Sequence, residues 1–95
     1  DCEDFAILYT SMAINKGYSA YVYIVDIDKN GIQLLHALSI VDDRILVDVP
    51  SKLYIEGKNE GDLFAKYIKA IKAEKVTVIN SFNDKEFSNI KKTYT

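Results

Sequence analysis

The sequence has one cysteine, Cys2, and one histidine, His36. Cys2 directly precedes a segment with helical periodicity, so we expect it in the first turn of a helix. There, unpaired backbone N–H groups and the helix dipole stabilise a thiolate, which is the nucleophilic form of cysteine. Glu3 and Asp4 follow at once, and their negative charges oppose that effect. A nucleophilic Cys2 would therefore need an imidazole beside it, and His36 is the only candidate.

Asp48 is the candidate third member of this group. His36 lies in LLHALSI, which is otherwise apolar apart from Ser39, and Asp48 is the lone polar residue of ILVDV. An unpartnered polar side chain in such a run would be costly. In a hairpin, His36 and Asp48 pair directly only if the loop has an odd number of residues, such as residues 41–43. A two-residue turn would put them on opposite faces. The catalytic interpretation therefore requires an odd loop or a bulge, with Cys2 within hydrogen-bonding distance of His36 and Asp48 on the other ring nitrogen.

The first half of the chain predicts a helix followed by an antiparallel meander. The helix spans about residues 2–16, with Asp1 as N-cap and Gly17 just beyond its end. The segments 19–27, 32–41 and 44–49 are rich in aromatic and β-branched residues and predict strands. The Asn-Gly pair at 30–31 is typical of a tight hairpin turn. The helix is expected to pack on the sheet through a stripe of apolar residues at helical spacing: Phe5, Leu8, Tyr9, Met12 and Ala13.

The second half predicts two short strands and two C-terminal helices. Residues 52–57 and 76–80 are candidate strands, and the apolar spacing over residues 64–71 indicates an amphipathic helix. Asn83, with Glu86 three residues later, resembles a capping box, which predicts a last helix through Phe87, Ile90 and Tyr94. The expected fold is one α+β domain over residues 1–95, with a Cys-bearing N-terminal helix on an antiparallel sheet. Because the chain begins with Asp rather than Met, we expect a processed form or a piece of a longer protein.

Composition excludes several classes of function. The net charge of −2 and the scattered lysines provide no basic surface for nucleic acid, and the apolar runs are far shorter than the roughly 20 residues of a membrane span. One cysteine allows no internal disulfide and is compatible with a reducing, cytoplasmic compartment. One Cys and one His leave too few ligands for a zinc site, and no calcium loop or glycine-rich phosphate loop is present. No cofactor or metal is expected, and the oligomeric state stays open.

Three stretches together resemble the transglutaminase-like superfamily of cysteine peptidases and acyltransferases, most closely its prokaryotic and archaeal members. They are DCEDFAILYTSMAINKGYSAYVYIV, the HALSIV segment that begins with the histidine, and the aspartate of ILVDVP. Cys2, His36 and Asp48 match the family's motif positions, and the resemblance covers residues 1 to about 50. The spacing from histidine to aspartate is shorter than in typical members, which a tight hairpin would explain. Residues 51–95 match no family pattern.

The resemblance implies a papain-like arrangement in which Cys2 attacks the carbonyl of a peptide or protein amide, His36 moves the proton and Asp48 holds the histidine tautomer. The backbone N–H of Cys2 would be one oxyanion donor. Hydrolysis is favoured over crosslinking, because nothing indicates the large calcium-dependent transglutaminases. Two alternatives stay open. One is a catalytically inactive transglutaminase-like binding or scaffold domain, and the other is an unrelated α+β domain in which the match of three residues is accidental.

Overall fold

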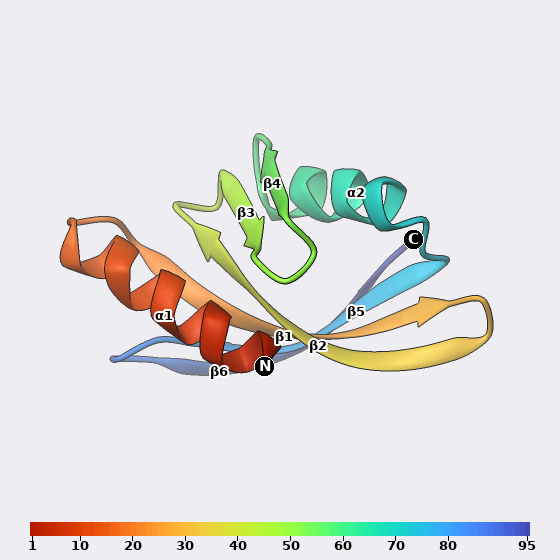
Figure 1. Ribbon diagram of the computed structural model, residues 1–95, viewed down its shortest axis with the longest axis horizontal. Coiled ribbons are helices and arrows are strands. Elements are labelled where there is room, and N and C mark those ends of the chain that lie inside the picture. The colour runs from red at the N-terminus through yellow and green to blue at the C-terminus, as the bar shows by residue number, and fades with distance from the viewer.

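Six antiparallel strands form one sheet, in the order β4-β3-β2-β1-β5-β6, in the computed structural model, which describes residues 1–95 (Figure 1). Two helices complete an α+β fold, with the N-terminal helix preceding all the strands, as predicted. The elements are α1 (Cys2–Asn15), β1 (Ala20–Lys29), β2 (Ile32–Val41), β3 (Ile45–Asp48), β4 (Leu53–Glu56), α2 (Glu60–Ile71), β5 (Lys75–Phe82) and β6 (Phe87–Tyr94).

The β1–β2 hairpin forms the centre of the sheet. Its two-residue turn, Asn30-Gly31, has positive φ at both positions (54° and 75°), which is the geometry that an Asn-Gly pair adopts most readily. Ten residue pairs then run without interruption from Lys29–Ile32 to Ala20–Val41. This register decides which side chains of β2 share a face, because consecutive residues of a strand point to opposite sides.

The larger core lies between the sheet and α2. It has twelve buried residues, and its centre is a set of aromatic side chains on α2 and β1 in which Phe64 contacts Tyr23 and Tyr67. Glu60, in the first turn of α2, accepts hydrogen bonds from the hydroxyls of Tyr23 on β1 and Tyr94 on β6. These two bonds fix the N-terminal end of α2 to two separate strands. The remaining core residues are Val25, Ile27, Leu38, Ile40, Leu46, Leu63, Ile68, Val76 and Val78.

Helix α1 covers the opposite face of the sheet through small residues. Its buried positions are Ala6, Thr10 and Ala13, and the Thr10 hydroxyl lies 2.7 Å from that of Ser39 on β2. The predicted contact stripe was wrong for Leu8 and Met12, which are 59% and 52% exposed, and for Phe5, whereas Ala13 is buried and Tyr9 packs beside it. The small residues are also spaced by three and four, and they allow the helix backbone to come close to the strands. Most of the large apolar side chains of α1 therefore face outward, and Tyr9 and Ile14 are partly buried.

The predicted last helix was also wrong, because residues 87–94 form strand β6. Asn83 does bond to backbone N–H groups, but its Oδ1 accepts from Lys85 and Glu86 inside the turn of the β5–β6 hairpin. The apolar residues of this segment do not share one buried face, because Ile90 and Tyr94 pack against the larger core whereas Phe87 is 61% exposed. The pairing with β5 shifts by one residue near Lys91, whose φ is 55°. A capping-box pattern and an Asn-based turn use the same residue types, so the pattern alone could not separate them.

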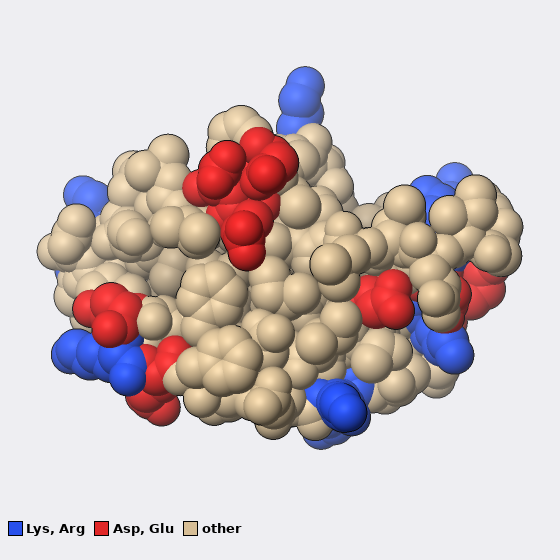
Figure 2. Space-filling model, turned by 90° about the horizontal axis from the view of Figure 1, so that it is seen from below, with Lys and Arg blue, Asp and Glu red and all other residues tan.

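Strand β3 covers only the end of β2. The pairing runs from Ser39–Val47 to Val41–Ile45, so residues 32–38 of β2 have a strand partner on the β1 side alone. The structure has no helix long and apolar enough to cross a membrane. On the face shown in Figure 2, lysine and arginine side chains form small separate groups, and most of the surface is uncharged.

Candidate functional site

His36 and Asp48 lie on the same face of the sheet. The loop between β2 and β3 has three residues, 42–44, so the prediction of an odd loop is confirmed, although the loop begins one residue later than expected. Ser39 opposes Val47, and this register offsets His36 and Asp48 diagonally by two residues instead of pairing them directly. An offset of two leaves both side chains on the face that carries α2.

The His36 ring and the Asp48 carboxylate form a close pair. Nε2 of His36 lies 2.9 Å from both Oδ1 and Oδ2 of Asp48. The Asp48 side chain is fully buried, and that of His36 is 16% exposed. The contact predicted between these two residues is therefore present, and the buried carboxylate has a partner.

Tyr67 completes the environment of Asp48. Its hydroxyl donates a hydrogen bond to Asp48 Oδ2 at 2.6 Å, from the middle of α2. Burial is the main cause that raises the pKa of Tyr67 far above its ordinary value, and the bond to Asp48 adds to it. Sequence reasoning placed Tyr67 on the apolar face of this helix but missed its role. A signal was present, because a buried tyrosine hydroxyl and a buried carboxylate each require a partner.

The environment keeps Asp48 ionised. Burial acts to raise its pKa, but hydrogen bonds from His36 and Tyr67 and the charge of His36 outweigh burial, so the pKa of Asp48 lies below its usual value. An ionised carboxylate only accepts hydrogen bonds, so Nε2 of His36 must carry the proton in the bond between them. In a neutral imidazole the lone pair is then on Nδ1, which forms no hydrogen bond with the protein. The arrangement thus leaves Nδ1 as a base.

Cys2 is the first residue of α1, as predicted, and Asp1 caps the helix by accepting the N–H of Asp4. The Cys2 side chain is partly buried against Val22 and Ala37, on the α1 face of the sheet. His36 points to the other face, and no hydrogen bond joins its ring to the Cys2 sulfur. The direct bond predicted from the sequence is therefore not formed in this structure.

The thiol is nevertheless close to the histidine site. Cys2 packs against a small cluster that includes Ala37, the residue next to His36 on β2. The pairing of β2 with β3 begins only at Ser39, so His36 and Ala37 lie where β2 has no strand on that side. The structure thus brings His36, Asp48 and Tyr67 into contact and places Cys2 beside them without a bond.

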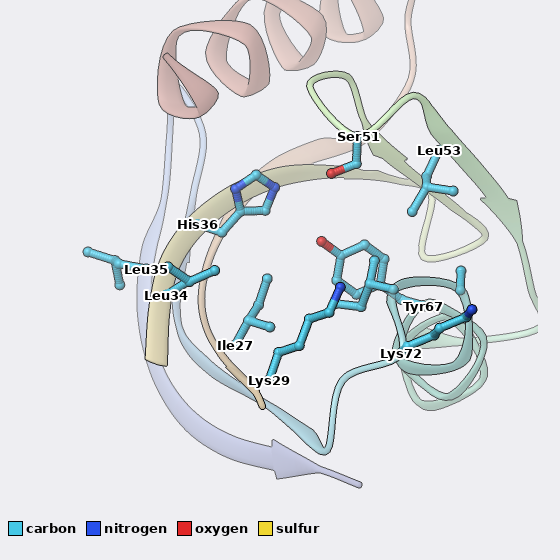
Figure 3. A pocket seen from close by; sticks show the side chains of 11 residues that line it. Ile27, Lys29, Leu34, Leu35, His36, Ser51, Leu53, Tyr67 and Lys72 are labelled. Carbon is cyan, nitrogen blue, oxygen red and sulfur yellow. The ribbon is translucent and has the colours of Figure 1, made fainter. Parts of the chain in front are cut away.

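A pocket opens next to His36 between β2 and α2. It has a volume of about 610 Å³ and is lined mainly by apolar side chains, with His36, Ser51 and Tyr67 on one side (Figure 3). Its size is within the range of roughly 300–1,000 Å³ that is typical of small-molecule sites. No group of three His, Cys, Asp or Glu residues lies close enough together to hold a metal ion.

Replacing Tyr67 by phenylalanine tests its role on Asp48. The change removes one of the hydrogen bonds that lower the Asp48 pKa, so we expect this pKa to rise and the protein to lose about 1–2 kcal/mol of stability. Urea unfolding at pH 6 measures the loss. Tyr54→Phe is the control, because this exposed side chain forms no hydrogen bond. Equal stability of Tyr67→Phe and the unmodified protein would show that the bond contributes nothing.

Comparison of the chain with protein-family models, with curated proteins and with solved structures finds no match in any of the three.

Proposed function

We propose that this protein is a thiol-dependent peptidase or amidase of the transglutaminase-like superfamily, with Cys2 as nucleophile, His36 as general base and acid, and Asp48 as the residue that orients His36. The observation that carries the proposal is the bond from His36 Nε2 to buried Asp48, which leaves Nδ1 without a protein partner. This tautomer is the one that can accept a proton from a thiol.

The proposed reaction has two halves. In the first, His36 Nδ1 takes the thiol proton, the Cys2 sulfur forms a C–S bond to the amide carbonyl carbon, and the C–N bond breaks as His36 gives the proton to the leaving amine. In the second, water attacks the thioester while His36 accepts its proton. The carboxylic acid leaves, and the Cys2 thiol recovers its proton.

This mechanism requires Cys2 and His36 to approach each other. His36 is fixed in place by its bond to the buried Asp48. Cys2 is the first residue of α1, and this helix contacts the strands through small side chains. The proposal therefore requires the first turn of α1 to move, so that the sulfur reaches Nδ1 while the His36–Asp48 pair stays in place.

A catalytically inactive binding domain is the second candidate, and one observation favours it. The outward side of α1 exposes large apolar side chains directly after Cys2, including Phe5, Leu8 and Met12. Scattered exposed apolar residues are normal, but a row along one helix is typical of a surface that another protein covers. If α1 binds another protein through these residues, Cys2 has only a packing role at the start of the helix.

Alkylation of Cys2 separates the two candidates. As the only cysteine, it gives a single-site reaction with iodoacetamide that mass spectrometry can follow at pH 7. If His36 acts on the thiol, we expect His36→Ala to slow alkylation by about tenfold, because the thiolate loses its cationic partner. Asp84→Asn, on the exposed β5–β6 turn, is the control for a change of charge elsewhere. Equal rates in His36→Ala and the unmodified protein would favour the binding domain.

A further inference from the structure

The pocket beside His36 contains a cation with no partner. Lys29 is the last residue of β1, and it lines the pocket together with apolar residues of β1 and β2. Its side chain extends into the space between β2 and α2, in the direction of Tyr67 (Figure 3). The structure forms no ion pair with Lys29, whereas Lys66 and Lys75 pair with Asp62 and Asp28.

The acidic groups nearest to Lys29 in the chain are already engaged. Asp28, its neighbour on β1, pairs with Lys75 on β5 and points to the other face of the sheet. Glu74 accepts the backbone N–H of Asn30 at the hairpin turn. Lys72, at the C-cap of α2, adds a second positive charge at the rim of the pocket. The pocket is therefore apolar with a positive end and has no carboxylate of its own to neutralise it.

We propose that this pocket binds a peptide that carries an apolar side chain and a carboxylate, and that Lys29 is the residue that selects the carboxylate. The apolar part of the ligand would lie on Ile27, Leu34 and Leu53, and the carboxylate would pair with the Lys29 ammonium group. This inference rests on the proposed function in one respect: it takes the ligand to be the substrate of the His36 site.

The chemistry explains why such a ligand fits. A partly buried lysine with no partner loses hydration without gaining an ion pair, and a bound carboxylate compensates for that loss. The apolar walls contribute roughly 25 cal/mol for each Å² of apolar surface that the ligand buries. The carboxylate has two possible sources, the free C-terminus of a peptide or an acidic side chain within it. Both present the same group to Lys29.

Binding of three short peptides tests the proposal. The probes are Ac-Leu-Leu-Phe with a free C-terminus, the same peptide with a C-terminal amide, and Ac-Leu-Leu-Glu-amide. Isothermal titration calorimetry is done on Cys2→Ala, so that no turnover interferes. We expect at least one of the two carboxylate peptides to bind about tenfold more tightly than the Phe amide, and the tighter one identifies the source of the carboxylate. Equal binding of all three, or no binding, would overturn the proposal.

Variants at Lys29 make the test specific. With Cys2→Ala as the background, Lys29→Gln should lose the tenfold preference, Lys29→Arg should keep it, and Lys29→Glu should reverse it. Lys75→Gln is the matched control, because it removes a lysine from the neighbouring strand outside the pocket. If Lys29→Gln were to unfold, the comparison between Lys29→Arg and Lys29→Glu would still decide. A preference that survives in Lys29→Glu would overturn the assignment to Lys29.

The peptide-binding experiment and the alkylation experiment can fail separately, so each proposal has its own test. If peptide binding depends on Lys29 but the alkylation rate of Cys2 is unchanged in His36→Ala, the pocket binds peptides and the thiol mechanism is wrong. If the alkylation rate depends on His36 but no carboxylate peptide is preferred, the catalytic proposal is supported and only the proposed role of Lys29 is overturned.

Discussion

Asp48→Ala is expected to lower the free energy of unfolding by about 3 kcal/mol. The change removes the shared partner of the His36 ring and the Tyr67 hydroxyl and leaves a small cavity where a fully buried side chain was. Truncating one member of a buried polar network costs roughly 3–5 kcal/mol when the remaining groups stay buried, and the partial exposure of His36 reduces this figure. Urea unfolding at pH 6 measures the change.

Two comparisons make the result specific to the buried network. Asp48→Asn keeps the shape and one acceptor oxygen, so we expect a smaller loss of about 1–2 kcal/mol. Asp84→Ala removes an exposed carboxylate and should change stability by less than about 0.5 kcal/mol. If Asp48→Ala were as stable as Asp84→Ala, the network would not contribute to folding.

The same carboxylate predicts how stability depends on pH. The pKa of Asp48 is lower in the folded protein than in the unfolded chain, where it is about 3.9. The unfolded chain therefore binds the proton more readily, and the contribution of Asp48 is complete above that value and lost as pH falls through the lower folded value. We expect the stability difference between the unmodified protein and Asp48→Asn to be larger at pH 6 than at pH 3. A difference that does not change with pH would contradict the lowered pKa.

The second large effect concerns turnover. If Cys2 and His36 act as proposed, His36→Ala should lower kcat/KM for a peptide p-nitroanilide by about 10³-fold or more, and Cys2→Ala should abolish turnover. Asp48→Asn should reduce kcat by a comparable factor, because an asparagine can present its NH₂ group to the ring and favour the other tautomer. The double variant His36→Ala/Asp48→Asn should be little worse than His36→Ala, since the residues act as one unit.

Controls separate this loss from damage to the fold. Asp48→Asn is compared with the unmodified protein at a temperature where circular dichroism shows both to be folded. Lys75→Gln, outside the site, should keep full activity. Turnover that persists in Cys2→Ala would exclude the thiol mechanism, and folded protein without turnover on any peptide would favour the binding domain.

The sequence predicted the central hairpins well because their signals are local. The Asn30-Gly31 turn sets the β1–β2 register, and the isolated polar residues His36 and Asp48 marked positions that need partners in an apolar sheet. The requirement for an odd loop followed from strand alternation alone. The offset between His36 and Asp48 could not be predicted in the same way, because three-residue loops at 41–43 and at 42–44 both leave the two side chains on one face.

The remaining errors have a common cause in packing choices that the sequence leaves open. Helix α1 has two possible contact stripes, one of large and one of small residues, and the structure uses Ala6, Thr10 and Ala13. The distance between Cys2 and His36 depends on that choice, so the sequence could not supply it. In the last segment, Asn83 and Glu86 have the spacing of a helix N-terminus, but Asn83 bonds within a hairpin turn and a strand follows.

Residues 32–38 of β2 pair with β1 alone, so one side of this strand is open to pairing with an extended polypeptide. A sheet margin with free N–H and C=O groups is a template for another strand, and proteins usually protect it with charges or bulges. The margin at β6 has both, with Lys91 at the bulge and Lys92 beside it. The margin of β2 over residues 32–38 has neither, and Ile32 and Leu35 are exposed along it. The backbone of β2 over residues 32–38 therefore has a free side, next to His36, on which an extended polypeptide could pair as a seventh strand.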